Sequence, residues 1–302
     1  MEKITAVVVT YNRLELLKRV IDSLRNQTRK LDNIIVINND SPDGTKDWLD
    51  SQVDLDVIHQ ANVGGSGGFY RGIEYAYQKG FDKIWCMDDD VFPKADCLES
   101  LLKYDGEDVG IMVPLRYMNN QPFYGEVERL NLSNPFKPMR KVVDDSSFKD
   151  GVVSIEQMAF EGPLINRRVV EKIGLPNKEL FILFDDTDYS YRTTLVGMKV
   201  LLIKTANLDK YDFKTNFAKK EKFVRDKWKI FYDLRNTTYF DHVYGKNVFY
   251  RYIGNIWNYL GVTAHFFVHY IFGKNYYQWK DLSLIFKTYL WGVKHHLGKI
   301  SI

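Results

Sequence analysis

The sequence predicts an α/β fold: an open, mostly parallel Rossmann-like sheet flanked by helices, followed by a mainly helical appendage. Three observations predict it. Apolar, β-branched runs alternate with segments of helical periodicity, each run ends in a group of polar residues, and the chain becomes aromatic and basic after residue 210. Because parallel strands place their carboxyl ends along one edge, the polar groups are expected to meet there and bind a ligand.

The first strand–helix–strand unit opens the chain. Ile4 to Thr10 is a β-branched run, Leu14 to Gln27 has apolar residues at helical spacing, and Asn33 to Ile37 is a second apolar run. After the second run, Asp40 is expected either to contact the base or ribose of a nucleotide or, with Ser41, to cap the next helix. After the first run come the candidate donor-binding residues Thr10, Tyr11, Asn12 and Arg13.

A glycine-rich segment follows, from Asn62 to Gly72, and leads into the helical pattern Ile73 to Gln78. Glycine permits positive φ and close backbone approach, and bare amides at a helix N-terminus suit a negatively charged ligand. The segment is therefore expected to be either an anion-binding helix N-terminus or a flexible loop. It matches neither the dinucleotide fingerprint nor a P-loop. The candidate binding residues here are Asn62, Gly65, Gly68 and Arg71.

Three consecutive aspartates, Asp88, Asp89 and Asp90, end the apolar strand Phe81 to Met87. Adjacent carboxylates repel one another, and a bound divalent cation relieves that repulsion. Hard oxygen ligands suit Mg²⁺ or Mn²⁺, which in turn hold a diphosphate. The alternative is a solvated acidic turn that caps the next helix.

A second acidic cluster contains Asp185, Asp186 and Asp188, after the apolar run Leu180 to Leu183. Acidic residues in a first helical turn interact favourably with the helix dipole, which would explain one of them. Three exceed what capping requires. A carboxylate here is positioned to act as a general base toward an attacking hydroxyl.

Together these elements resemble family 2 glycosyltransferases of the GT-A fold, and within that group the bacterial galactofuranosyltransferases and rhamnosyltransferases. The resemblance covers about residues 3 to 210. It implies nucleotide contacts from the first strand's loop and the Asp40 region, and diphosphate, ribose and metal contacts from Asp88 and Asp90. It also implies that Asp186 is the catalytic base, with Asp185 beside it. The matching motifs are Thr10-Tyr11-Asn12-Arg13, Asn62 to Gly72, Asp88-Asp89-Asp90 and Phe184-Asp185-Asp186-Thr187-Asp188-Tyr189.

Two departures from the galactofuranosyltransferase pattern concern the site. Those proteins carry tryptophan where this chain has Phe184, and a metal-binding histidine about two dozen residues past the acidic pair. No histidine lies between His59 and His242 here. Asp209 is the candidate replacement as third metal ligand; alternatively Lys210 neutralises phosphate directly.

Length and composition fit this reading. In 302 residues we expect a catalytic domain over residues 1–210, with nucleotide binding in 1–115 and the acceptor side in 116–210, and a helical region over 211–302. Cys86 and Cys97 are expected to be reduced core thiols of a cytoplasmic protein, since no signal peptide is apparent.

The net charge of +3 is unevenly distributed. Residues 210–302 carry 16 Lys and Arg against 6 Asp and Glu, a net charge of +10, which leaves −7 for residues 1–209. The same residues 210–302 hold 25 of the 45 aromatic residues. Basic and aromatic character together suit an anionic membrane surface, and Tyr252 to Gly273, which contains no Asp, Glu, Lys or Arg, is expected to form an interfacial or buried helix. The alternative is a homo-oligomer contact. Nucleic-acid binding is not expected, because the front half is acidic and no RNA-binding signature is present.

Two smaller patterns in this region have alternatives. His265 and His269 have the i, i+4 spacing of metal ligands but are expected to be packing residues. Arg235 is expected either to reach a phosphate or to pair with Asp233.

The sequence thus predicts an inverting glycosyltransferase that needs Mn²⁺ or Mg²⁺. The favoured donor is UDP-galactofuranose, then dTDP-rhamnose, and the acceptor is a lipid-linked surface glycan on the inner face of the cell membrane. A sugar-nucleotide nucleotidyltransferase is one alternative, although Thr10 to Arg13 lacks its glycine-rich loop. A non-catalytic membrane scaffold is the other, although it would not need both acidic clusters.

Overall fold

The computed structural model describes residues 2–213, 219–272 and 277–301. In the helix that begins at residue 219, side chains are described from residue 226. The chain divides into two compact units. Unit 1 comprises Met1–Arg129, Val142–Lys178 and Asp185–Asp212, and unit 2 comprises Leu130–Lys141, Glu179–Phe184 and Phe213–Ile302. Two segments of the predicted acceptor side, 130–141 and 179–184, therefore cluster with the C-terminal helices.

Unit 1 is built on a ten-stranded sheet in the order β10-β12-β6-β11-β4-β1-β2-β3, with β5 on β12 and β7 on β6. The strands β4, β1, β2 and β3 are parallel, as are β6 and β12, whereas β11 runs antiparallel between β4 and β6. The strands are β1 Ile4–Thr10, β2 Asn33–Asn38, β3 Asp56–His59, β4 Lys83–Asp88, β5 Val91–Pro93, β6 Val109–Met118, β7 Gln121–Phe123, β10 Val152–Ile155, β11 Leu164–Asn166 and β12 Lys199–Lys210. A separate two-stranded sheet joins β8 (Glu128–Leu130) to β9 (Arg140–Val142).

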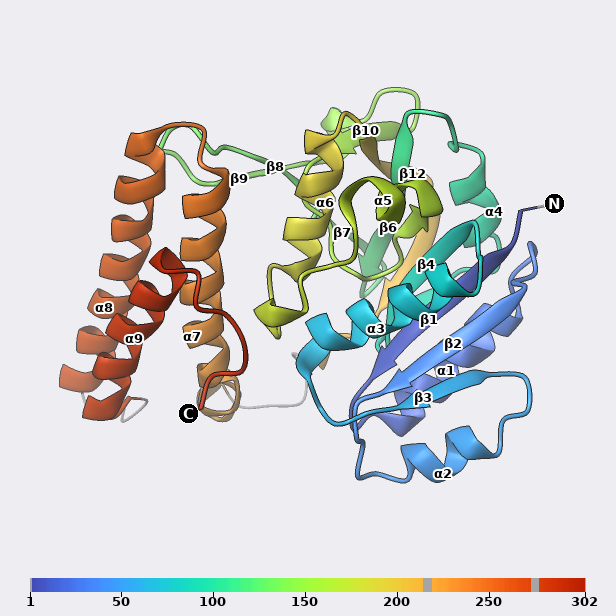
Figure 1. Cartoon of the computed structure of the whole chain (residues 1–302), viewed down its shortest axis with the longest axis horizontal. Helices are drawn as coiled ribbons and strands as arrows, with labels where there is room; N and C mark the ends of the chain where they lie inside the picture. Colours follow the sequence, from blue (N-terminus) through green and yellow to red (C-terminus); the bar gives the residue numbers. More distant parts are fainter. Residues whose placement is uncertain (1, 214–218, 273–276, 302) are drawn as a thin grey trace. The chain divides into compact units, whose positions relative to one another are not determined.

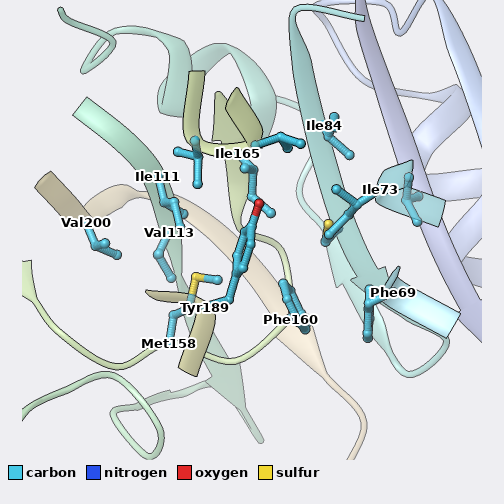
Figure 2. Packing of buried hydrophobic residues seen from close by; sticks show 14 of the residues in the cluster. Phe69, Ile73, Ile84, Ile111, Val113, Met158, Phe160, Ile165, Tyr189 and Val200 are labelled. Carbon is cyan, nitrogen blue, oxygen red and sulfur yellow. The ribbon is translucent and has the colours of Figure 1, made fainter. Parts of the chain in front are cut away.

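Helices cover both faces of the sheet, and each face has its own core (Figure 1). On one face the apolar stripe of α1 (Leu14–Arg25) is buried, together with Cys97, Leu98 and Leu101 of α4 (Cys97–Leu102). On the other lie α3 (Gly64–Gln78), α5 (Arg167–Ile173) and α6 (Asp185–Leu195), where Phe69 stacks on Phe160 with ring centroids 4.4 Å apart and Tyr189 packs beside them (Figure 2). The remaining short helices of this unit are α2 (Thr45–Asp50), η1 (Asp145–Ser147) and the start of η2 (Lys178–Leu180).

Unit 2 is mainly helical. Its helices are α7 (Lys219–Tyr244), the π-helical turn η4 (Tyr250–Gly254), α8 (Asn255–Ile271) and α9 (Trp279–Val293), of which α7 packs against both α8 and α9 (Figure 1). A third core holds them together and includes Phe231, Phe266 and Ile285. Among the described residues no helix is long and apolar enough to cross a membrane.

Candidate active site

The loop after β1 and the three aspartates at the end of β4 meet because β1 and β4 are neighbouring strands, with Val9 opposite Asp88. The carboxylate of Asp89 accepts hydrogen bonds from Thr10 Oγ1 (2.8 Å), from the Tyr11 amide (3.2 Å) and from Arg13 Nη1 (2.8 Å). Burial raises the pKa of Asp89, and Arg13, Thr10 and Tyr11 oppose that shift. The middle aspartate therefore holds the loop after β1 in place.

The outer aspartates face a third carboxylate that sequence reasoning missed. Asp88, Asp90 and Glu161 each offer an oxygen, and the three oxygens lie within 4.8 Å of one another. Asp90 Oδ1 is buried and has no hydrogen-bond partner among the described residues. Hard oxygen ligands in such a set suit Mg²⁺ or Mn²⁺, so these residues fit a divalent cation.

Glu161 reaches this place because Gly162 is tied to β4. The Gly162 amide donates to Cys86 O (2.8 Å), and Trp85 Nε1 donates to Gly162 O (2.7 Å). Gly162 has φ 93°, and a Cβ there would lie 2.4 Å from Leu208 Cδ2, so only glycine fits. The available sequence signal was a glutamate directly before glycine and proline at the entry to a strand.

Burial dominates the electrostatics of the cluster. Burial raises the pKa of Asp90 to about 6, with Glu161 adding to the shift, and raises that of Asp88 well above its usual value, with Asp90 and Glu161 contributing. Burial also acts to raise the pKa of Glu161, but Arg116 and Lys210 bring it below the ordinary value. Arg116 Nη1 lies 2.5 Å from Glu161 Oε2, and Lys210 Nζ contacts the other oxygen. The glutamate is therefore ionised beside two aspartates that a cation would help to ionise.

The structure does not bring Asp209 to these carboxylates. It pairs instead with Lys94, Oδ2 to Nζ 2.5 Å, on the part of β12 that pairs with β5. Neighbouring side chains of a strand point to opposite faces, so Lys210 rather than Asp209 faces the cluster. The third carboxylate is Glu161, with which Lys210 forms an ion pair; the role of Lys210 toward phosphate stays a prediction.

The glycine-rich segment is helical rather than a loop. Helix α3 begins at Gly64, whose amide donates to Asn62 Oδ1 (3.0 Å). A Cβ at Gly68 would lie 2.5 Å from Val9 Cγ1, and one at Gly72 would lie 2.2 Å from Val7 Cγ1. The glycines therefore bring α3 against β1, and packing overrides the low helix propensity of glycine.

Three other residues that were predicted to contact the donor are Gly65, Arg71 and Asp40. At Gly65 a Cβ would meet nothing within 4 Å, and Arg71 pairs with Glu74, Nη1 to Oε2 2.7 Å, on the helix surface. Asp40 is exposed with φ 61°. It does not cap α2: Asp43 Oδ1 accepts from the Thr45 amide (3.3 Å), while Ser41 Oγ accepts from the Asn12 amide (3.0 Å).

The second acidic cluster opens α6. Asp185 is buried, and burial raises its pKa to about 6. The backbone of Asp185 and Asp186 and the Ser66 side chain on α3 act to lower that pKa. Asp186 is partly exposed; burial, with Asp185 and Glu126 adding, raises its pKa well above the usual value. Asp188 forms an ion pair with Arg192, in which Arg192 Nε lies 2.8 Å from Asp188 Oδ2. Of the three, Asp186 is the most accessible residue.

Unit 2 fixes the loop that precedes this helix. Asn236 Nδ2 lies within 3.1 Å of Leu180 O, 2.9 Å of Ile182 O and 2.9 Å of Leu183 O. Arg235 is buried, and its guanidinium donates to Leu180 O (3.0 Å) and Gly298 O (2.5 Å). Its Nε also donates to Asn236 Oδ1 (2.8 Å), so these groups, and not Asp233, are the partners of Arg235 in the structure; its contact with a phosphate stays a prediction.

The histidine pair of α8 packs as expected. The rings of His265 and His269 lie 4.0 Å apart, and His265 Nδ1 is 2.9 Å from the Tyr277 hydroxyl. Within the described ranges neither joins a group of three potential metal ligands.

Residues 5–151 match the model of the family Glycosyl transferase family 2. These residues form a domain of this family, and the chain is a glycosyltransferase. It is 27% identical over 215 residues to galactofuranosyltransferase GlfT1 of Mycolicibacterium smegmatis, covering 65% of this chain and 67% of that one. It is 26% identical over 206 residues to dTDP-rhamnosyl transferase RfbF of Shigella flexneri, covering 66% of each. The chain thus spans about two thirds of the length of these relatives.

Solved structures confirm the GT-A fold. The crystal structure of GalNAc-T7 with UDP, GalNAc and Mn²⁺ aligns with TM-score 0.58 and 15% identity, covering 89% of this chain and 58% of that one. Mannosyltransferase PcManGT from Pyrobaculum calidifontis, in complex with GDP-Man and Mn²⁺, aligns with TM-score 0.53 and 12% identity, covering 96% and 87%. The predicted α/β architecture with a helical C-terminal region is confirmed.

Proposed function

We propose that this glycosyltransferase moves a sugar from a nucleotide-diphosphate donor to a lipid-linked surface glycan, with inversion at the anomeric carbon. The observation that carries the proposal is the set of Asp88, Asp90 and Glu161 at the carboxyl end of β4. Galactofuranose is the favoured sugar and rhamnose the next, because the relatives named above are a galactofuranosyltransferase and a dTDP-rhamnosyl transferase.

The three carboxylates would hold Mn²⁺ or Mg²⁺. When bound, such an ion supplies positive charge that stabilises the diphosphate leaving group. Asp90 Oδ2 pairs with Arg13, but the buried Oδ1 has no hydrogen-bond partner among the described residues and the pKa of Asp90 is raised. Both observations support the assignment, since a bound cation would contact the oxygen and favour the ionised carboxylate. Arg116 and Lys210 orient Glu161 within the set.

The chain's own residues would perform a single displacement. The acceptor oxygen attacks the anomeric carbon, the bond from that carbon to the diphosphate oxygen breaks, and the acceptor proton passes to Asp186. A raised pKa makes Asp186 a stronger base than an exposed carboxylate. The loop after β1, held by Asp89, and the start of α3 would contact the nucleotide and the donor sugar.

We further propose that unit 2 binds the inner membrane surface through α8. Its exposed apolar residues fall within about 120° of the helix circumference at 100° per residue. No charged Asp, Glu, Lys or Arg interrupts Tyr252 to Phe272, and the region as a whole is basic, which suits anionic headgroups. The residues of this face are Ile256, Trp257, Leu260, Phe267, Val268 and Ile271.

A donor panel tests the proposed function. The protein is incubated with UDP-galactofuranose, dTDP-rhamnose, GDP-mannose and UDP-glucose, with Mn²⁺ or Mg²⁺ and an octyl glycoside acceptor, and released nucleoside diphosphate is measured. We expect release from one donor, abolished by chelator. Pyrophosphate release in the presence of a nucleoside triphosphate and a sugar phosphate would indicate a nucleotidyltransferase instead. No turnover of any donor would contradict the proposal.

A further inference from the structure

Unit 2 contains a cavity that no part of the proposed mechanism uses. Its volume is about 280 Å³, and every residue that lines it belongs to unit 2. The volume lies just below the roughly 300–1,000 Å³ of sites for drug-sized ligands, which suits a single sugar ring. The lining residues are Pro135, Lys137, Met139, Arg140, Phe184, Asp233, Thr237, Asp241, Tyr250, Gly254 and Asn258.

The most informative lining residue is Asp241. It is 5% exposed, and its Oδ1 is buried without a hydrogen-bond partner among the described residues. Burial raises the pKa of Asp241 to about 7, while the Tyr250 hydroxyl opposes the shift. Buried carboxylate oxygens in native proteins are nearly always hydrogen-bonded, so this one lacks a ligand group or water.

The cavity is also formed by an irregular turn. Tyr250 and Gly254 are the ends of the π-helical turn η4, and π-turns occur frequently at functional sites. Gly254 has helical backbone angles, φ −55° and ψ −44°, so its lack of a side chain is not required by the backbone. A Cβ at Gly254 would lie 3.5 Å from Pro135 Cβ and 4.0 Å from Asp241 Oδ2, inside the cavity.

The chemistry of the lining selects the class of ligand. Two acids, Asp233 and Asp241, and two bases, Lys137 and Arg140, line the cavity, so it presents groups of both kinds rather than the single kind that a phosphate or a metal ion requires. Thr237, Tyr250 and Asn258 add hydroxyl and amide groups. The Arg140 guanidinium lies over the Phe184 ring, 5.4 Å from its centroid. Paired carboxylate, amide and hydroxyl groups beside an aromatic ring suit a neutral ligand whose hydroxyls both donate and accept.

From this geometry we propose that the cavity around Asp241 is a subsite for a sugar of the acceptor glycan other than the one that reacts. This rests on the proposed function for the nature of the acceptor. Phe184 lines the cavity and precedes Asp186 by two residues, and a chain spans at most about 3.6 Å per residue. The cavity wall and the proposed base are thus two residues apart in the chain.

The test uses the full-length protein and two variants of the cavity. Asp241→Asn keeps the shape of the side chain and removes the ionised form. Gly254→Ala places a methyl group in the cavity and favours the helix by roughly 1 kcal/mol, so the protein stays folded. Gly261→Ala is the matched control, because Gly261 lies within α8 and a Cβ there would meet nothing within 4 Å.

Binding of octyl galactofuranoside and octyl rhamnoside, as monosaccharides and disaccharides, is followed by saturation-transfer NMR, and transfer kinetics are measured with the same probes. Both cavity variants should raise the KM of the disaccharide at least tenfold, with the donor KM and the monosaccharide KM within twofold of the parent and of Gly261→Ala. Equal effects on both acceptors, or no effect on sugar binding, would overturn the subsite. If no donor is turned over, the proposed function fails, whereas the NMR experiment still decides whether the cavity binds sugar.

Discussion

Replacement of Asn236 should loosen the loop that carries the acidic pair. The loop 180–184 contains three non-glycine residues in the left-handed region, Phe181 (φ 67°), Leu183 (φ 66°) and Phe184 (φ 69°). Each such residue costs about 1–2 kcal/mol, so roughly 3–6 kcal/mol of strain is offset by contacts. The Asn236 amide is the central contact, since it reaches three carbonyls of this loop.

The magnitude follows from the hydrogen bonds that Asn236→Ala removes. Two amide hydrogens are shared among three acceptors, and each bond contributes about 0.5–1.5 kcal/mol, with a further 1–3 kcal/mol where a buried carbonyl is left unsatisfied. We expect unit 2 to lose about 2–4 kcal/mol of unfolding free energy. Because that loss is comparable to the strain, the loop should relax, and turnover should fall at least tenfold with the donor KM nearly unchanged.

Two assays check this expectation. Urea unfolding followed by tryptophan fluorescence reports mainly on unit 2, which holds four of the six tryptophans. Steady-state kinetics separate kcat from the donor KM. Asn26→Ala is the control, because Asn26 is exposed and its amide bonds only to Asp22 of its own helix; it should change stability by less than about 0.5 kcal/mol. An Asn236→Ala protein with unchanged stability and turnover would show that the hydrogen bonds do not hold the loop.

Three further predictions concern the base, the metal and the membrane. Asp186→Asn should lower the transfer rate by roughly 10²-fold or more at unchanged donor affinity. Because the pKa of Asp186 is raised, the loss of kcat/KM on acidification should begin above the usual carboxyl range of about pH 4. A greater loss of transfer in Asp185→Asn than in Asp186→Asn would reverse the assignment of the base. Glu161→Gln should weaken Mn²⁺ binding in calorimetry at least tenfold, whereas Asp209→Asn should leave it within twofold, and equal effects would contradict the Glu161 assignment. Sedimentation with anionic vesicles should fall in high salt and in Trp257→Ser but not in Val53→Ser, an exposed apolar residue of unit 1; binding that ignores both lipid charge and salt would point to a protein contact instead.

The parallel core of the fold was predictable because its strands carry local signals. β1 spans Ile4–Thr10 as expected, and β2 and β4 lie within two residues of their predicted ends. Buried parallel strands read as continuous apolar runs, and their polar ends necessarily meet at one edge. The proximity of Thr10 and Asp89 could therefore be expected from the sequence, although the hydrogen bond that joins them could not.

Sequence reasoning missed features that depend on contacts between distant residues. Glu161 joins Asp88 only because the segment before β11 crosses β4, and no periodicity in the chain indicates an antiparallel strand at that place. The glycine-rich segment left an anion-binding helix N-terminus and a flexible loop open, and the sequence did not indicate that Gly68 and Gly72 fit against Val9 and Val7. Likewise the grouping of residues 130–141 and 179–184 with the C-terminal helices depends on packing rather than on composition.

The boundary between the two units has a mechanistic consequence. It falls between Phe184 and Asp185, so the strained loop belongs to unit 2 and the helix that carries Asp186 belongs to unit 1. The backbone of the proposed base is thus held at its amino side by Asn236 and at its carboxyl side by α6, whereas Asp88, Asp90 and Glu161 depend on unit 1 alone. Changes at Asn236 should therefore affect acceptor activation and leave donor and metal binding intact. This separation distinguishes a positioning role for Asn236 from general destabilisation, which would weaken all three together.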